Sequence, residues 1–398
     1  MAATDRYSAR EQGLGYMYQA RFALLQILKM PESTSLLIEK DDDIDFVDAD
    51  GHKTLGSLKH RADGNKLTDL STDFWKSVRI WLARYKRDGR IQCALRFFLF
   101  TTSKVAERSF LQSFLPEADP SLDRPGLAKK ALGLTESPLV KTIRDELSTL
   151  HDAELNDFLA RVLILERGPR IDDLPALIVE RYMRSIRREF RPHVFERLEG
   201  WWTDQVINLL TGKRRDPIVG NEVSDKLAVL ADEYKADNLP INFRGAMPET
   251  ATNAISDPRL FVAQLREIGI NKDSIQFAIL DYYRAYEQRS MWARQQVIDS
   301  EEVELYEDRL VEEWGRYKAV IFEDLDETSA ETTLVKAGKE LYRWAQLANE
   351  SLRIRARVTE PYVTRGGFHM LANVRPQPRV HWHPRFLARV GALLGTTE

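Results

Sequence analysis

The sequence lacks several features that would each point to a class of protein. Only one cysteine, Cys93, occurs among 398 residues, which excludes an intramolecular disulfide and a cysteine-based zinc site and favours a reducing compartment. The longest apolar runs, such as 80–83 and 97–100, are far shorter than the roughly 20 residues that a membrane-spanning helix needs. The first residues also lack the apolar stretch of a secretory signal. We therefore expect a soluble, cytoplasmic protein that does not associate with a membrane.

A phosphate-binding P-loop is also missing, because no G-x-x-x-x-G-K-[ST] sequence occurs in the chain. The chain is not expected to hydrolyse ATP by that route, so any ATPase would be a partner. The composition, 43% hydrophobic and 30% charged, is that of an ordinary globular protein. The length predicts two or three domains.

Charge of one sign is not in excess over the whole chain, whose formal net charge of -3 argues against a uniformly basic nucleic-acid-binding surface. Residues 1–104, however, carry 17 basic against 14 acidic side chains. Much of this basic charge lies in the stretch WKSVRIWLARYKRDGR, where a helix is expected to turn its apolar stripe inward. The residues predicted to contact DNA phosphates there are Lys76, Arg79, Arg84 and Arg87. The alternative is an ordinary solvated helix face.

Changes in the hydrophobic period divide the chain into three regions. Residues 1–105 mix helical and strand-like patterns, which predicts a compact α/β unit, whereas helical patterns dominate 106–250 and 251–398. The fold class is therefore an α/β domain followed by a mostly α-helical middle and carboxy-terminal region. Helices are expected near 8–29, 69–86, 260–268, 273–297, 300–322 and 331–349, strands near 35–38, 44–47, 54–58 and 94–102, and a tail of short strands at 365–384.

The richest chemistry lies in LLIEKDDDIDFVDADGHKTLGSLKHR, where acids precede a hairpin-type turn at Asp50-Gly51. If 43–47 pairs with 55–59, Asp43 lies opposite Lys59 and Asp45 opposite Ser57. Period two then places all four side chains on one face of the sheet. The acids of this stretch are Glu39, Asp41, Asp42, Asp43 and Asp45.

Carboxylates beside a lysine indicate metal-dependent phosphodiester hydrolysis. Carboxylate oxygens suit Mg²⁺, with Mn²⁺ as a substitute, and a lysine can orient or deprotonate the attacking water. The alternative from spacing alone is that the acids solvate a turn and that Lys59 points into water.

The order helix, three strands, helix, strand, with an acid starting the second strand and a lysine ending the third, resembles the PD-(D/E)XK nuclease superfamily. The finer resemblance, over about the first 105 residues, is to the nuclease domain of anti-phage effectors of the CBASS type. The matching positions are Gly15, Tyr18, Gln19, Glu39, Asp43, Ile44, Lys59, His60 and the strand 98–102. The resemblance implies catalytic roles for Asp43, Lys59, Glu39 and Gln19.

One position departs from that pattern, because Ser57 stands where the superfamily has an acid or a glutamine. The second metal-binding group is then expected to be Glu39 or a backbone carbonyl near Leu58. Gln19 would hold the lysine or a water, and Asp45 is the alternative metal ligand if the register differs by two. A Ser57→Gln change is expected to keep or raise activity, because it returns a ligand to the metal.

The carboxy-terminal region, with YRAYEQRSMWAR, LVKAGKELYRWA, RGGFHMLAN and VHWHP, resembles the terminal domains of ABC-three-component proteins. Joined to such a nuclease, this arrangement resembles the effector subunit of Lamassu anti-phage systems. The resemblance implies cleavage of double-stranded DNA, restraint by an SMC-like ATPase with a third small subunit, and an active homo-oligomer, a dimer or tetramer. The rival interpretation is a non-catalytic DNA-binding or adaptor subunit with a degenerate nuclease fold.

Overall fold

The computed structural model describes residues 5–61, 64–134, 137–248, 254–348 and 350–389. The chain divides into two compact units, Met1–Leu230 and Ala231–Glu398. Within the described residues, no helix combines the length and the apolar character needed to cross a bilayer.

Unit 1 is built on a six-stranded mixed sheet with the strand order β7-β5-β3-β2-β1-β8. The first three strands form an antiparallel meander, whereas β5 runs parallel to β3 and β7 runs parallel to β5. The strands are β1 (Ser35–Ile38), β2 (Ile44–Val47), β3 (Lys53–Lys59), β5 (Leu95–Thr101), β7 (Val162–Leu165) and β8 (Ile218–Val219), with a separate pair β4 (Lys66–Leu67) and β6 (Lys104–Val105).

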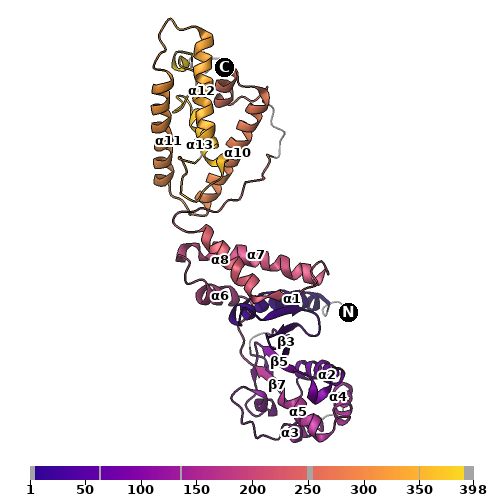
Figure 1. The fold of residues 1–398 in the computed structure, drawn as a ribbon. Coiled ribbons are helices and arrows are strands. Elements are labelled where there is room, and N and C mark those ends of the chain that lie inside the picture. The colour runs from indigo at the N-terminus through magenta and orange to yellow at the C-terminus, as the bar shows by residue number, and fades with distance from the viewer. Residues whose placement is uncertain (1–4, 62–63, 135–136, 249–253, 349, 390–398) are drawn as a thin grey trace. The chain divides into compact units, whose positions relative to one another are not determined.

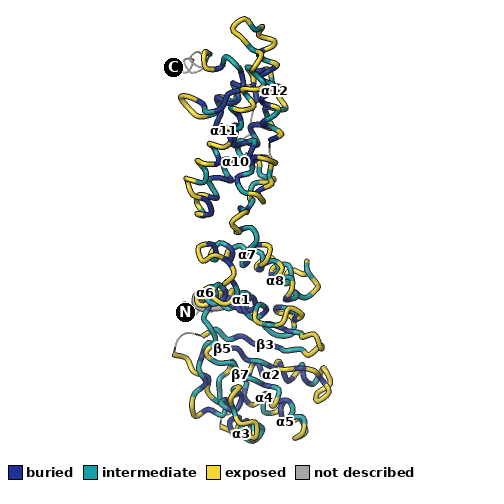
Figure 2. The backbone as a smooth tube through the Cα atoms, turned by 60° about the vertical axis from the view of Figure 1, so that its left-hand side comes forward, coloured by how far each residue is buried: buried dark blue, intermediate teal, exposed yellow. Residues whose placement is uncertain are grey.

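Helices cover both faces of this sheet (Figure 1). One layer comprises α1 (Asp5–Lys29), α6 (Leu174–Tyr182), α7 (Arg191–Leu210) and α8 (Gly220–Glu233). The other comprises α2 (Thr72–Arg87), α3 (Arg124–Leu132), α4 (Pro138–Ser148) and α5 (Asp152–Ala160), and short 3₁₀ turns lie at Arg90–Gln92, Phe110–Phe114 and Arg188–Phe190. The sheet is therefore the buried middle layer, as the dark strands of Figure 2 show.

Helix α2 is amphipathic and packs its apolar stripe on β3 and β5. As expected from the sequence, Trp75, Val78 and Leu82 are buried. Trp81 stacks on Phe97 of β5 with ring centroids 5.6 Å apart. The face of the sheet that carries the polar residues of β3 is thus covered by α2.

The β2–β3 hairpin has a different register from the expected one. Ile44 lies opposite Gly56 and Asp45 opposite Leu55, so the pairing is displaced by two residues. The cause is the turn, where the Asp48 side chain accepts the N–H of His52 and β3 begins directly afterwards. Because the displacement is even, Asp45 and Ser57 stay on the face that was expected.

The middle region contains strands that the sequence did not indicate. β7 and β8 both join the sheet, and α3 to α7 pack around it, so residues 106–230 belong to unit 1. The sequence placed boundaries near 105 and 250, whereas the structure divides once, after Leu230. All four residues of β7 are apolar, so the sequence of this strand has no alternation of apolar and polar residues that would identify it.

Unit 2 is helical in the part that the structure describes. Its helices are α9 (Leu260–Glu267), α10 (Lys272–Arg294), α11 (Ser300–Ile321), α12 (Glu331–Leu347) and α13 (Pro361–Ala372). The expected tail of short strands at 365–384 is wrong, because the chain forms α13 up to Ala372 and then turns and bends without a strand from 373 to 384. A Cβ on Gly366 would lie closer than 3.0 Å to Ala285 Cβ and Asp281 O of α10. The glycine therefore permits a close approach of two helices and does not mark a turn.

Candidate functional site

Asp43 lies directly before β2 and contacts groups from two other elements of unit 1, α1 and β3. Gln19 Nε2 of α1 donates a hydrogen bond to Asp43 Oδ1 at 3.0 Å. Asp43 Oδ2 accepts the backbone N–H of Leu58 at 2.6 Å and lies 3.4 Å from both Lys59 Nζ and Ser57 Oγ. The structure thus brings together Asp43, Lys59 and Gln19, although Gln19 contacts the carboxylate and not the lysine.

The ammonium group of Lys59 is held by two oxygens. Its Nζ lies 2.9 Å from Ser57 Oγ in addition to the contact with Asp43. Ser57 is 1% exposed, and its Oγ lies 2.8 Å from Ser77 Oγ of α2, which is equally buried. A chain of two buried hydroxyls therefore links α2 to the lysine.

Ser77 was not identified from the sequence, although a signal was present. It lies on the inward stripe of α2 between Phe74 and Trp81, at the helical spacings that share a face. A hydroxyl at such a position needs a hydrogen-bond partner. Its partner here is Ser57, together with the carbonyl of Asp73 at 3.0 Å.

Glu39 lies at the end of β1, with a positive φ of 53° and its backbone N–H donated to the Asp43 carbonyl at 3.1 Å. This β1–β2 turn brings the two carboxylates to the same end of the sheet. Partial burial raises the pKa of Glu39, and Asp43 acts in the same direction, while a hydrogen bond from Gln19 opposes both. Gln19 is therefore shared between the two acids.

Two neighbouring acids have structural roles. Asp45 is fully buried, accepts the N–H groups of Asp41 and Asp42, and pairs with Lys53 Nζ at 2.9 Å. Asp42 accepts the Trp81 Nε1–H, and burial together with the nearby Asp43 raises the pKa of Asp42 to about 6. Because the Asp45 side chain is fully buried, whereas that of Asp43 is 21% exposed, Asp45 is the weaker candidate for a metal ligand.

The basic side chains predicted to contact DNA have unequal surroundings. Arg84 and Arg87 approach Asp41 Oδ1 at 3.0 and 3.9 Å, so their charge is partly offset. Arg79 pairs with Glu146 at 3.0 Å. Lys76 is exposed and has no ion-pair partner among the described residues.

A second acidic group lies at the tip of the β2–β3 hairpin. Asp48, Asp50 and His52 place one possible ligand atom each within 4.8 Å of one another, and all three are exposed. Asp48 is occupied by the turn, because it accepts the N–H groups of Asp50 and His52. This cluster is a useful comparison for the Asp43 group, since it has similar chemistry without a lysine.

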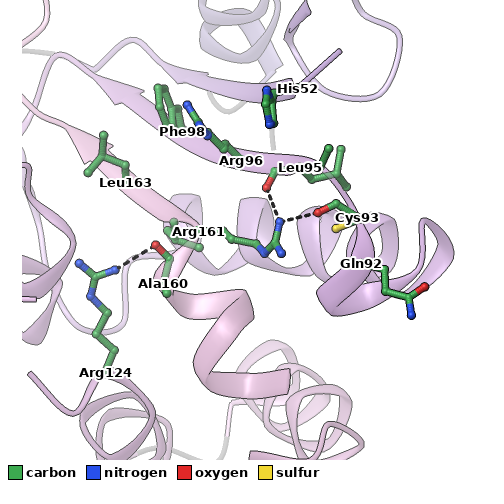
Figure 3. Close-up of a pocket in the computed structure, with 12 residues that line it drawn as sticks. His52, Gln92, Cys93, Leu95, Arg96, Phe98, Arg124, Ala160, Arg161 and Leu163 are labelled. Carbon is green, nitrogen blue, oxygen red and sulfur yellow. Dashed lines mark hydrogen bonds between the residues drawn. The ribbon is translucent and has the colours of Figure 1, made fainter. Parts of the chain in front are cut away.

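A cavity of about 590 Å³ in unit 1 lies at the amino ends of β3, β5 and β7 (Figure 3). The Asp43 group lies at the other end of β3, about 20 Å away along a seven-residue strand. Arg161 donates to the carbonyls of Cys93 and Leu95, and Arg124 donates to that of Leu159. Two arginines of this cavity therefore hold the backbone, and the cavity is separate from the candidate site.

Comparisons with known proteins bear on unit 2. Residues 261–390 match the C-terminal domain 7 of the ABC-three component (ABC-3C) systems. This match supports the interpretation of the chain as an ABC-3C anti-phage defence protein. The ABC-3C-like domain covers most of unit 2 and leaves the sheet of unit 1 outside the match.

No curated protein matches the chain. Among solved structures, a Moraxella osloensis Cap4 SAVED/CARF-domain containing receptor is 17% identical, with a TM-score of 0.34, over 64% of this chain and 60% of that one. The chain thus spans less than two thirds of that protein, and a TM-score this low assigns neither fold nor function.

Proposed function

We propose that the chain is the effector endonuclease of an ABC-3C anti-phage defence system and that unit 1 is a PD-(D/E)XK nuclease. The observation that carries the proposal is the convergence of the Asp43 carboxylate and the Lys59 ammonium at 3.4 Å, with Glu39 at the same end of the sheet. The element order α1-β1-β2-β3-α2-β5, apart from the short β4, supports it as well.

The donor groups are of the kind that Mg²⁺ prefers, since Mg²⁺ usually binds one or two carboxylates and keeps several waters. Asp43 and Glu39 would hold the ion, which would polarise the phosphate of double-stranded DNA. Mn²⁺ would fit the same oxygens. Asp43 is fixed by Gln19 and by the Leu58 N–H, so its carboxylate is already oriented.

Lys59 has the remaining role. Because Ser57 and Asp43 hold its ammonium group, Lys59 Nζ has a fixed position from which it can orient the attacking water or stabilise negative charge on the phosphate. The basic surface of α2, and Lys76 in particular, would contact the DNA backbone outside the site.

A second candidate function is a non-catalytic DNA-binding or adaptor subunit. The observation that favours it is that Ser57 occupies the place of an acid and that Asp43 Oδ2 already receives a backbone N–H at 2.6 Å. In that case the Asp43 group would be a structural hydrogen-bond network without a metal.

The two functions are separated by cleavage of supercoiled plasmid by the full-length chain in Mg²⁺, Mn²⁺ or EDTA. Asp43→Ala and Lys59→Ala should each lower the metal-dependent rate by about 100-fold or more. Asp50→Ala, which removes an exposed acid from the hairpin tip and leaves the Asp48 side chain in the turn, should leave it unchanged. A parent chain that binds DNA but never cuts it would support the adaptor.

We further propose the Lamassu arrangement, in which an SMC-like ATPase and a third small subunit restrain the nuclease. The ABC-3C-like domain supports such partners. Leu305, Tyr317 and Val320 of α11 are exposed apolar side chains, which suits a protein contact. Release from the ATPase would allow the nuclease chain to form a dimer or tetramer that cuts DNA.

Light scattering of the chain alone and with the ATPase tests this control. The free chain should be a dimer or tetramer that cuts DNA, and the partner should reduce both oligomer size and cutting. Val320→Glu should weaken the partner contact without changing cleavage by the free chain. A free chain that stays monomeric and cuts at full rate would contradict the arrangement.

A further inference from the structure

A cavity of about 570 Å³ lies within unit 2 between α10, α12 and α13. Its size is in the range of small-molecule sites. The residues that the argument uses are Phe277, Asp281, Lys339, Arg343 and Arg365, which all line it. No role of these residues follows from the nuclease proposal, because they lie in the other unit.

Three cations converge in this cavity, but only one has an acidic partner. Arg365 Nε lies 3.0 Å from Asp281 Oδ2, and Asp281 is the only acid of the lining. Lys339 and Arg343 have no ion-pair partner among the described residues. The lining therefore carries an excess of two positive charges.

The two unpaired cations are also placed unfavourably for a chain without a ligand. Lys339 and Arg343 lie four residues apart on α12, so they share a helix face and repel each other. Lys339 is half-buried over Gly269, where less water screens its charge. An anion between the two side chains would turn this repulsion into attraction.

The remaining features narrow the class of anion. A phosphomonoester carries a charge close to -2 at neutral pH, which matches the excess charge of the lining. Phe277, on the same face of α10 as Asp281, is 69% exposed at the rim. An exposed aromatic ring beside arginine and lysine offers a surface on which a planar ring can stack.

We propose that this cavity binds a phosphomonoester of nucleotide size, with its phosphate held by Lys339, Arg343 and Arg365 and its ring system on Phe277. This inference goes beyond the proposed nuclease function and does not depend on it. The ligand would give the ABC-3C-like domain a small-molecule input separate from any partner contact.

Calorimetric titration of the full-length chain with AMP, ribose 5-phosphate, adenosine and inorganic phosphate tests the proposal. AMP should bind most tightly, and adenosine, which lacks the phosphate, should bind at least tenfold more weakly. Lys339→Met and Arg343→Met should each weaken AMP binding at least tenfold. Lys272 is an exposed lysine at the start of α10 that does not line the cavity, so Lys272→Met should have no effect.

Phe277→Ala is a second variant, which separates the contribution of the ring system to binding from that of the phosphate. It should weaken AMP binding while leaving the binding of inorganic phosphate unchanged. Thermal unfolding of each variant identifies any loss caused by misfolding. The proposal is overturned if the parent chain binds no phosphomonoester at millimolar concentration, if adenosine binds as well as AMP, or if Lys272→Met weakens AMP binding as much as Lys339→Met.

Discussion

The packing of α13 on α10 gives a prediction in which two similar changes have opposite effects. Adding a methyl group in Gly366→Ala would place a Cβ closer than 3.0 Å to the Asp281 carbonyl and the Ala285 Cβ, whereas ordinary contacts are 3.4–4 Å. The two helices must therefore move apart by several tenths of an ångström. Overpacking of this kind costs about 1–3 kcal/mol.

Part of this cost is offset, because alanine is preferred to glycine in a helix by about 0.5–1 kcal/mol. The net loss should be about 1–2 kcal/mol. For a unit of this size that corresponds to a thermal midpoint lower by about 4–6 °C. Gly315→Ala is the matched control, because nothing lies within 4 Å of a Cβ at this position inside α11. That variant should raise the midpoint by about 2 °C.

Thermal unfolding of the full-length chain, with hydrogen exchange measured in peptides from α10 and α13, provides the assay. Gly366→Ala should speed exchange in both helices, and Gly315→Ala should not. An unchanged midpoint for Gly366→Ala would refute the close approach of the helices. Equal losses from both substitutions would show that the effect does not come from this contact.

Two further predictions concern pH and DNA. Burial, with smaller contributions from Arg365 and Arg259, lowers the pKa of His369 to about 3, so below pH 6.5 the unfolded chain binds a proton that the folded chain does not. The free energy of unfolding should therefore be at its full value above pH 6.5 and about 2 kcal/mol lower at pH 5. His369→Phe should flatten the pH dependence of the thermal midpoint over this range. Lys76→Ala should reduce the salt dependence of DNA binding by about one phosphate contact, measured by anisotropy. Arg84→Ala should reduce it less, because Asp41 already offsets its charge; equal reductions would contradict this difference.

The local periods of unit 1 were sufficient to predict where its first strands lie. β1 and β2 have the bounds that the sequence indicates, and the inward stripe of α2 is confirmed. The hairpin register was wrong by two residues, because the length of the turn depends on which N–H groups the Asp48 side chain accepts. Alternation alone does not contain that information, although it does fix which face each residue occupies.

Elements whose stability comes from distant contacts could not be predicted in the same way. β7 is four apolar residues that become a strand because β5 offers them a parallel partner. The Gly366-Gly367 pair lowers helix propensity, yet α13 is a helix because the missing side chains allow it to pack on α10. In both cases tertiary packing outweighs the local preference.

Ser57 is the position at which the structure most changes an expectation drawn from the sequence. A glutamine there was expected to return a metal ligand and to keep or raise activity. Ser57, however, is 1% exposed, with Ser77 Oγ at 2.8 Å and Lys59 Nζ at 2.9 Å, so α2 leaves no room for three more heavy atoms. Ser57→Gln should therefore cost about 1–3 kcal/mol of stability and displace Lys59.

Removing the obstructing hydroxymethyl group tests this interpretation. In Ser57→Gln combined with Ser77→Gly, the space above β3 becomes available to the longer side chain, so cleavage should exceed that of Ser57→Gln alone. The double variant should still melt below the parent, because a glycine inside α2 costs about 1 kcal/mol. If Ser57→Gln alone keeps both the melting temperature and the cleavage rate of the parent, α2 does not confine this position and the expectation from the sequence is correct. A loss that Ser77→Gly does not relieve would instead assign the serine hydroxyl its own part in holding Lys59.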